Sequence, residues 1–294
     1  MAIKTVGVIG CGLMGAGITQ VCAQSGYKTF VREVNDELLK KGLGKIDGFL
    51  AKSVEKGKMT AEQKAATMAN ITGTTQLADL KNCDLIIEAA IENIDLKKEI
   101  FGELDGLCPA ATIFASNTSS LTITEMAAAT KRGDRFVGLH FFNPVPLMKL
   151  VEVVRTIATS PQTFDAAFAF AKSLGKEPIT CKDNSGFVVN LLLVPYLLDA
   201  IRAVENKVAS IEDIDKGMTL GCGHPMGPLT LLDFVGIDTT YFIAEIMFKE
   251  YRDAKYAPPP LLRKMVLAGY HGKKSGKGFY DYSGEKPRVM DLGL

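Results

Sequence analysis

The chain opens with two different spacings of apolar residues. A short β-branched run from Val6 to Ile9 predicts a buried strand, and the apolar run after it predicts a helix that continues to Ser25. Gly26 ends that helix, and the stretch from Tyr27 to Glu33 predicts a second strand. Strand, helix and strand in this order form a βαβ unit, from which parallel sheets are built.

Strands and helices keep alternating through the first half of the chain. The stretch 36–70 is helical and polar, and it is longer than the helix of a minimal βαβ unit, so we expect a helical hairpin that projects from the sheet. Further strands are predicted at 85–88, 112–115, 135–141, 150–154 and 177–180, and helices at 94–107, from about 122, and at 161–174. The strand cores are nearly continuous apolar runs, which indicates a mostly parallel sheet covered on both faces.

The pattern changes at residue 186, where strand-like alternation stops. Residues 187–206 predict one long apolar helix with Pro195 inside it, Ser210 to Asp213 resemble a capping box, and Pro228 suits a first helical turn. We therefore predict two domains, residues 1–185 with the sheet and residues 186–294 all-helical. The long helix has more apolar surface than a small domain covers, so we expect a homodimer through the C-terminal domain.

Three glycines stand between the first strand and its helix. Gly10, Gly12 and Gly15 are in G-x-G-x-x-G register. In this arrangement the first allows a tight turn, the second lets a pyrophosphate approach the backbone, and the third lets the helix pack against the strand. Glu33, at the end of the second strand, can accept hydrogen bonds from an adenosine ribose. A plain glycine turn is the alternative, but all these parts in order favour an α/β, Rossmann-type dinucleotide-binding domain.

Composition limits the other classes of function. A net charge of +1 argues against a broad nucleic-acid footprint. The six cysteines show no metal-ligand spacing, so we expect no metal and several buried, reduced thiols in a cytoplasmic-type compartment. The longest apolar stretch, 187–201, is interrupted by polar residues and is too short to span a bilayer. With no targeting segment recognised before the first strand, we expect a soluble, cytoplasmic protein that does not bind membranes.

Only three histidines are available as a base near neutral pH. His271 lies in a basic segment and His224 in a turn-rich loop, whereas His140 ends a predicted buried strand. A histidine there can be a satisfied core residue. However, Glu92, Ser119 and His140 all fall at or after strand ends, and parallel sheets bind ligands at that edge. Glu152, on the next strand, could accept the second ring N–H of His140.

Several short motifs resemble those of the short-chain 3-hydroxyacyl-CoA dehydrogenases, also called 3-hydroxybutyryl-CoA dehydrogenases. The resemblance covers both predicted domains. It rests on the segments 10–15 (GCGLMG), 88–93 (EAAIEN), 116–120 (SNTSS), 138–144 (GLHFFNP), 186–190 (GFVVN), 223–228 (GHPMGP) and 276–280 (GKGFY).

The resemblance implies an NAD-dependent enzyme that acts on an acyl-CoA substrate. It implies that His140 is the general base, that Glu152 pairs with it, and that Ser119 hydrogen-bonds the reacting oxygen. Asn190 would complete the substrate site from the second domain, and Asn143 would support the base. The implied cofactor-binding positions are Gly10, Gly12, Leu13, Met14, Gly15, Glu33, Ala89, Glu92, Lys97, Asn117, Ser119 and Asn143.

Lys52 and Lys56 belong to a basic cluster on the predicted hairpin. On composition alone they fit a solvated helix face as well as a contact surface for a phosphate-bearing substrate. The resemblance places them where the hairpin meets the CoA phosphates and adenine, and we expect them to bind substrate together with Ser119 and Asn190.

Two positions depart from the family pattern. The family commonly has aspartate where this chain has Glu33, preceded here by Arg32, which could soften the exclusion of NADP. The family often has arginine where this chain has Leu191. Two other functions remain open at this point: a β-hydroxyacid dehydrogenase that acts on a free acid with a lysine base, and a non-catalytic dinucleotide-binding protein.

Overall fold

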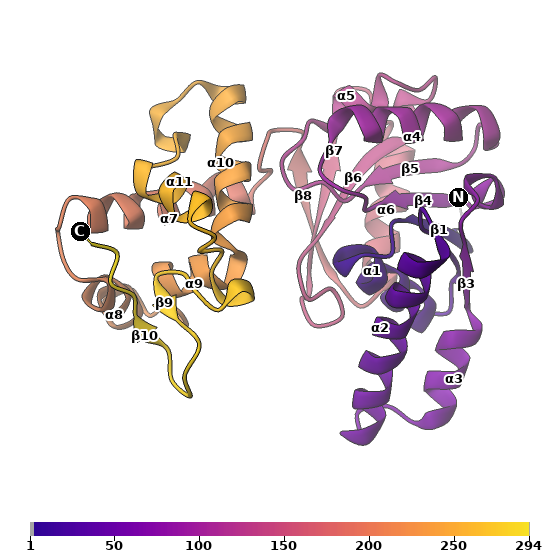
Figure 1. Cartoon of the computed structure of the whole chain (residues 1–294). Helices are drawn as coiled ribbons and strands as arrows, with labels where there is room; N and C mark the ends of the chain where they lie inside the picture. Colours follow the sequence, from indigo (N-terminus) through magenta and orange to yellow (C-terminus); the bar gives the residue numbers. More distant parts are fainter. Residues whose placement is uncertain (1–2, 294) are drawn as a thin grey trace. The chain divides into compact units, whose positions relative to one another are not determined.

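The computed structural model describes residues 3–293 (Figure 1). The chain divides into two compact units, the first ending at Phe187 and the second beginning at Val188. The first unit contains the sheet and the second is mainly helical, which is the predicted class of fold.

An eight-stranded sheet forms the centre of the first unit, in the order β3-β2-β1-β4-β5-β6-β7-β8. Neighbouring strands pair in parallel except β6 and β7, which are antiparallel, so the prediction of a mostly parallel sheet is confirmed. Strand β3 was not predicted, because it is short, contains Gly73 and lies half exposed at the sheet edge. The strands are β1 (Thr5–Ile9), β2 (Lys28–Arg32), β3 (Ile71–Thr74), β4 (Leu85–Glu88), β5 (Ile113–Ser116), β6 (Phe136–Phe141), β7 (Leu150–Arg155) and β8 (Glu177–Lys182).

Both faces of the sheet are covered, as the apolar strand cores predict. Consecutive residues of β4 show this: Ile86 and Ile87 are both fully buried but belong to different hydrophobic clusters, because side chains alternate across a strand. The helices and 3₁₀ turns of this unit are α1 (Leu13–Gln24), α2 (Asp36–Glu55), α3 (Ala61–Ala69), η1 (Leu77–Leu80), α4 (Ile94–Leu107), α5 (Ile123–Ala127), η2 (Gly133–Arg135) and α6 (Pro161–Ser173).

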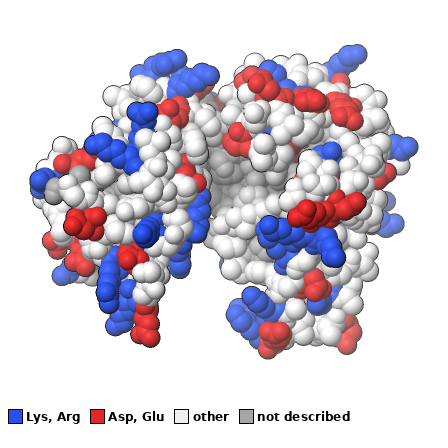
Figure 2. Space-filling model, in the orientation of Figure 1, with Lys and Arg blue, Asp and Glu red and all other residues white. Residues whose placement is uncertain are grey.

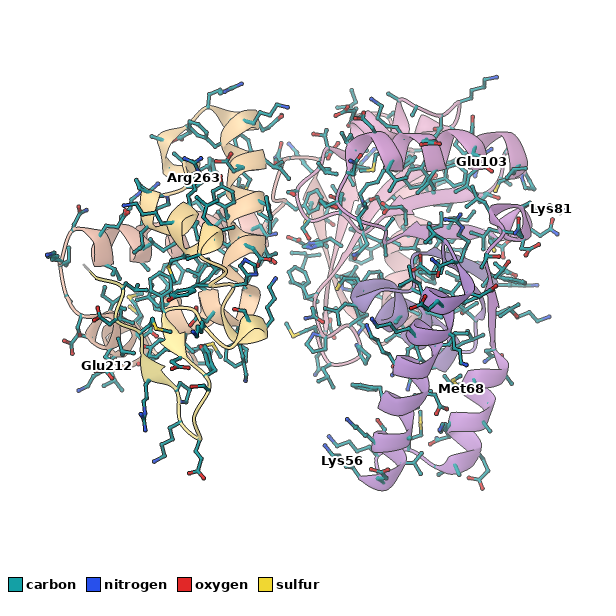
Figure 3. The ribbon with its side chains drawn as sticks, in the orientation of Figure 1. Lys56, Met68, Lys81, Glu103, Glu212 and Arg263 are labelled. Atoms are coloured by element: carbon teal, nitrogen blue, oxygen red, sulfur yellow. The ribbon has the colours of Figure 1, made fainter. Side chains whose placement is uncertain are left out.

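Helices α2 and α3 form the predicted hairpin. Asn35 caps α2, and Thr60 with Gln63 forms a capping box that starts α3. Lys52 lies in the last turn of α2 and Lys56 is its C-cap residue, and both are exposed. Figure 3 shows Lys56 at the end of the hairpin that is far from the sheet.

The second unit consists of helices and a short C-terminal strand pair. Ser210 caps α8, and Pro228 stands in the first turn of α9 as predicted, whereas the pairing of β9 with β10 was not predicted. The elements are α7 (Val189–Glu205), α8 (Ile211–Cys222), α9 (Pro228–Val235), α10 (Ile237–Tyr251), η3 (Ala254–Tyr256), α11 (Pro260–Leu267), η4 (Lys273–Ser275), β9 (Tyr280–Asp281) and β10 (Arg288–Val289).

Two buried carboxylates hold the C-terminal strand of this unit to its helices. Asp233 accepts the backbone N–H groups of Phe279 and Tyr280, both at 2.9 Å. Asp215 accepts the N–H of Leu229 at 2.7 Å at the start of α9, and the Tyr280 hydroxyl at 2.8 Å. Burial raises the pKa of Asp233 to about 6 in spite of these donors. Both carboxylates therefore have a structural role within this unit.

The remaining sequence expectations concern surface and thiols. On the face shown in Figure 2, acidic and basic side chains are interspersed, in keeping with the net charge of +1. All six cysteines are free and five are buried, which confirms that several are buried thiols. Within residues 3–293, no helix is long and apolar enough to cross a membrane, and no cluster of acidic, histidine or cysteine side chains could hold a metal ion.

Candidate active site

The carboxyl ends of β4, β5 and β6 bring the predicted catalytic side chains together. These strands are neighbours in the sheet and run in the same direction, so the residues that end or follow them lie at one edge. The Ser119 hydroxyl lies 3.0 Å from His140 Nε2, and Glu92 accepts the Ser119 backbone N–H at 3.2 Å. The predicted convergence of Glu92, Ser119 and His140 is therefore confirmed.

His140 and Glu152 form a buried pair across two strands. They stand opposite each other in the antiparallel β6–β7 register, so both side chains lie on the same face of the sheet. His140 Nδ1 is 2.6 Å from Glu152 Oε2, with exposures of 4% and 0% for the two side chains. Because a carboxylate only accepts hydrogen bonds, the ring proton is on Nδ1, and Nδ1–H donates a hydrogen bond to Glu152. In neutral His140 this leaves Nε2 as an acceptor toward Ser119.

Asn117 and Asn143 occupy different places around this pair. Asn117 is buried, and its side-chain oxygen accepts the backbone N–H of Phe141 at 2.9 Å, which ties the loop after β5 to β6. Asn143 is exposed in the loop after β6. It lines a pocket of about 120 Å³ together with Leu13 of α1 and Lys45 of α2. The first asparagine therefore supports the strand that carries His140, and the second faces solvent beside the glycine turn.

A buried ion network lies behind Glu92. Lys97 is 1% exposed, and its ammonium lies 2.6 Å from Glu88 and 3.3 Å from Glu92. Glu88 is fully buried and also accepts the Ser116 hydroxyl at 2.6 Å. Glu92 in turn accepts the Thr118 hydroxyl. Lys97 thus holds Glu92 from the interior side, and buried charges paired in this way are costly to break.

Three partners in this network were not among the predicted site residues. Glu88, Ser116 and Thr118 all lie in the motifs quoted above, directly at or after strand ends. Their position at the carboxyl edge of the sheet was the available signal. The pairing with Lys97 could not be inferred, because Lys97 reaches Glu88 from α4.

The glycine turn has the shape that a pyrophosphate requires. Gly10 has φ 92°, and a Cβ there would lie 2.6 Å from the Ala89 carbonyl oxygen. A Cβ on Gly15 would lie 1.9 Å from the Gly10 carbonyl oxygen, whereas one on Gly12 meets nothing within 4 Å. Gly12 is the N-cap of α1 and has no side chain to cap the first N–H groups, which belong to Leu13, Met14 and Gly15. The open space at Gly12 and the uncapped N–H groups suit an anionic group.

Glu33 is fixed beside this turn. Its carboxylate accepts the backbone N–H of Cys11 and that of Val34, each at 2.8 Å. The acid therefore stands preorganised at the end of β2, where the ribose of a dinucleotide lies in this type of domain. The Arg32 side chain donates to the Thr75 carbonyl at 3.3 Å. These residues fit NAD.

The other predicted positions lie on the hairpin and in the second unit. Lys52 and Lys56 are exposed on the hairpin. Asn190 is the second residue of α7 and is half-buried within the second unit. Leu191, where the family often has arginine, packs against the apolar core of that unit.

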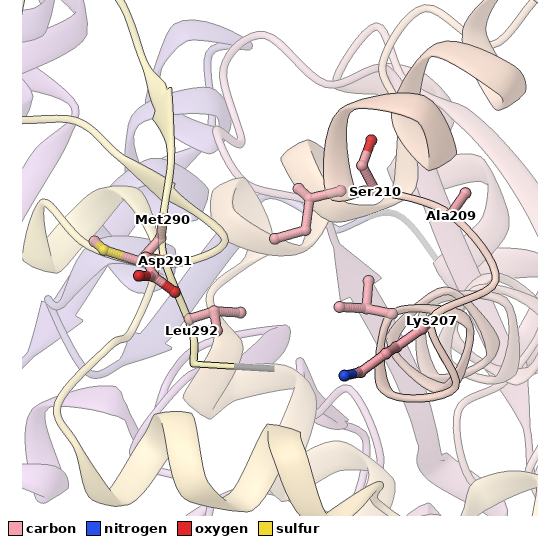
Figure 4. Close-up of a pocket in the computed structure, with 8 residues that line it drawn as sticks. Lys207, Ala209, Ser210, Met290, Asp291 and Leu292 are labelled. Carbon is pink, nitrogen blue, oxygen red and sulfur yellow. The ribbon is translucent and has the colours of Figure 1, made fainter.

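A further pocket in the second unit contains none of the predicted site residues. It has a volume of about 420 Å³ and lies between the α7–α8 turn and the C-terminal segment (Figure 4). It is lined by Val204, Lys207, Ala209, Ser210, Ile211, Met290, Asp291 and Leu292.

Comparison with known proteins gives matches along nearly the whole chain. The family model "3-hydroxyacyl-CoA dehydrogenase, NAD binding domain" matches residues 5–184, and the model for the C-terminal domain of the same family matches residues 186–282. A 3-hydroxybutyryl-CoA dehydrogenase of Mycobacterium tuberculosis is 49% identical over 284 residues, which covers 96% of this chain and 99% of that protein. The human mitochondrial hydroxyacyl-coenzyme A dehydrogenase is 49% identical over 288 residues, covering 95% and 91%.

Solved structures agree with the sequence relatives. The crystal structure of (S)-3-hydroxybutyryl-CoA dehydrogenase from Ralstonia eutropha superimposes with a TM-score of 0.92 at 47% identity, and the match covers 96% of this chain and 100% of that one. With both family models matched and relatives of this identity over nearly its full length, the chain belongs to the 3-hydroxyacyl-CoA dehydrogenase family.

Proposed function

We propose that this NAD-dependent 3-hydroxyacyl-CoA dehydrogenase interconverts (3S)-3-hydroxybutyryl-CoA and acetoacetyl-CoA, with His140 as the general base. The observation that carries the proposal is the position of His140 between Glu152 at 2.6 Å and Ser119 at 3.0 Å, at the same edge of the sheet as the glycine turn. A histidine oriented on one nitrogen and free to accept on the other is suited to proton transfer.

Each polar group has a definite task in this reaction. When bound, NAD supplies the hydride acceptor. His140 Nε2 accepts the proton of the substrate 3-hydroxyl as the neighbouring carbon loses its hydride, and Glu152 stabilises the resulting imidazolium through Nδ1–H. Ser119 donates to the reacting oxygen. Asn190, from the second domain, would hold the acyl group near its thioester.

On the cofactor side, we assign the glycine turn with Leu13 and Met14 to the pyrophosphate and Glu33 to the adenosine ribose. Glu92, steadied by Lys97, would face the nicotinamide half together with Ala89, Asn117 and Asn143. Glu33 favours NAD over NADP because a carboxylate repels a 2′-phosphate. We assign these residues to an NAD-binding domain over 1–185 and the substrate-completing role to a second domain over 186–294.

The hairpin lysines would recognise the CoA part of the substrate. Lys52 and Lys56 are exposed ammonium groups at the end of α2, where a phosphate can reach them from solvent. The alternative is that the lysines form a solvated helix face. The two hypotheses predict different effects of charge reversal on acyl-CoA binding.

The test compares three substrates with NADH. We expect reduction of acetoacetyl-CoA and almost none of acetoacetate, because the free acid lacks the CoA contacts. The double variant Lys52→Glu/Lys56→Glu should raise KM for acetoacetyl-CoA but not for acetoacetyl-N-acetylcysteamine, which has no phosphates. Lys81→Glu, an exposed lysine outside the hairpin (Figure 3), is the control. Preferential turnover of acetoacetate would support the free-acid alternative, and no turnover of any acyl-CoA would support a non-catalytic protein.

We further propose a homodimer that forms through the C-terminal domain. Leu192 on α7 is 70% exposed and Phe242 on α10 is 57% exposed, and both apolar side chains would be buried in such an interface. Sedimentation at micromolar concentration should give twice the chain mass of 31.7 kDa. Phe242→Glu should shift the equilibrium toward monomer, and Leu107→Glu in the first unit should not. A monomeric wild-type mass would refute the proposal.

We also propose a cytoplasmic location, which the free thiols favour. Cell fractionation followed by the acetoacetyl-CoA assay tests it, and activity confined to an organelle fraction would contradict it.

A further inference from the structure

The His140 ring has two aromatic neighbours in addition to its polar partners. The ring centroid of Phe142 lies 4.5 Å away and that of Phe187 lies 5.6 Å away. Phe142 follows the base closely on the same stretch of chain. Phe187 comes from the segment after β8, far along the sequence, and is 2% exposed. The contact between Phe187 and the base therefore depends on how that segment is held.

Phe187 has an unusual backbone conformation. Its φ is 48°, in the left-handed region where a Cβ crowds the backbone. Lys207 and Arg252 share this conformation among residues 3–293, but both are exposed and lie just past helix ends, where left-handed residues are common. Of these three residues, only Phe187 combines it with a buried, bulky side chain. Such a residue persists where its surroundings fix it, and these positions gather at functional sites.

The segment that leads to Phe187 is held by the Ser119 loop and by the start of α5, the helix that follows this loop. Asp183 accepts the backbone N–H groups of Ile123 at 2.9 Å and Thr124 at 2.6 Å. Ser185 donates its hydroxyl to the Ser120 carbonyl at 2.8 Å. The segment that leads to Phe187 is thus fastened to Ser120, next to Ser119, and to the first residues of α5.

We propose that Phe187 is a positioning residue for His140, an inference that rests on the proposed role of His140 as general base. Its ring restricts rotation of the imidazole, so that Nε2 keeps its direction toward Ser119 while Nδ1 stays on Glu152. Phe187 is also the last residue of the first unit, and the chain enters the second unit directly after it. The connection to the unit that contains Asn190 is therefore made at a residue in contact with the base.

The first test replaces the ring by an aliphatic side chain. Phe187→Leu should lower kcat for acetoacetyl-CoA reduction by up to about 10²-fold, because small misplacements of a reacting group have effects of this size. The dissociation constant of NADH should not change. Phe170→Leu is the matched control: Phe170 is 3% exposed, and its ring contacts Tyr27 and not His140. Both variants lose a buried ring and should lose thermal stability to a similar degree, but only Phe187→Leu should lose kcat.

The second test observes the base directly. With three histidines in the chain, the ring ¹H–¹³C signals can be assigned with His140→Asn. Phe187→Leu should shift the His140 ring signals and leave those of His224 and His271 in place. This spectrum does not depend on turnover. If the wild type failed to reduce acetoacetyl-CoA, the proposed function would be refuted while the contact could still be verified.

The variant Phe187→Gly distinguishes the effect of the aromatic ring on kcat from the effect of the left-handed backbone conformation. Glycine adopts φ 48° without strain, which offsets part of the stability lost with the buried ring, and this variant should still lose kcat. The proposal is overturned if Phe187→Gly or Phe187→Leu keeps the wild-type kcat. It is also overturned if Phe170→Leu lowers kcat as much as Phe187→Leu does. An unchanged His140 signal in Phe187→Leu would overturn it as well.

Discussion

Replacing His140 by Asn should lower kcat for acetoacetyl-CoA reduction by about 10²–10⁴-fold, the usual contribution of a general base. Asparagine places its amide nitrogen near the position of Nδ1, so a donor to the buried Glu152 is kept while the basic Nε2 is lost. His140→Ala should be equally inactive but less stable, because it leaves the Glu152 carboxylate buried without this donor. Steady-state kinetics and thermal unfolding measure the two effects.

The affinity for NADH provides the control for this prediction. Fluorescence titration should give an unchanged dissociation constant for His140→Asn, because the glycine turn and Glu33 are untouched. A His140→Asn enzyme with wild-type kcat would remove His140 from the mechanism. Loss of NADH binding would instead indicate that the variant had disturbed the sheet edge as a whole.

Gly15→Ala should abolish NADH binding and destabilise the protein. Its Cβ would lie 1.9 Å from the Gly10 carbonyl oxygen. Because this oxygen belongs to the backbone and cannot rotate away like a side chain, either α1 or the turn has to move. Overpacking of this kind typically costs about 1–3 kcal/mol. Thermal unfolding and NADH titration should both change.

Substitutions at two other glycines distinguish an effect on protein stability from an effect on NADH binding. A Cβ on Gly12 meets nothing within 4 Å, so Gly12→Ala should fold normally but lose NADH affinity, because the methyl group stands where the pyrophosphate approaches. Gly44→Ala, in the middle of α2 and also with nothing within 4 Å, should bind NADH normally and gain up to about 1 kcal/mol of stability. Equal behaviour of Gly12→Ala and Gly44→Ala would contradict the placement of the pyrophosphate.

Elements with a continuous apolar run or a full helical period were predictable, and half-exposed or two-residue strands were not. The helix predicted at 94–107 is α4 to the residue, because Asn93 and a full amphipathic period mark its start. Strand β3 has the same length as the predicted β4, but it contains Gly73 and is half exposed, and β9 and β10 have only two residues each. They exist because a neighbouring strand supplies hydrogen-bond partners, which is tertiary information.

The candidate site also has features that the sequence predicts and features that it does not. Ser119 and His140 could be predicted as neighbours because parallel strands bring their carboxyl ends to one edge, and Glu152 as the partner of His140 because it lies on the next strand along the chain. The burial of Lys97 between Glu88 and Glu92 could not, since an interior lysine looks like any surface lysine in a helical sequence. The left-handed φ of Phe187 was also invisible, because bulky residues so rarely adopt it.

The uneven burial of the cysteines makes the protein easy to label at one place. Thiol reagents attack the thiolate, and burial raises the pKa of Cys11 to about 11 and of Cys83 to about 12. Cys222, at the end of α8, is the one exposed cysteine. A maleimide dye on wild-type protein therefore reports from a single position in the second unit. Its fluorescence can follow, in real time and without any substitution, how that unit responds when NADH or an acyl-CoA binds.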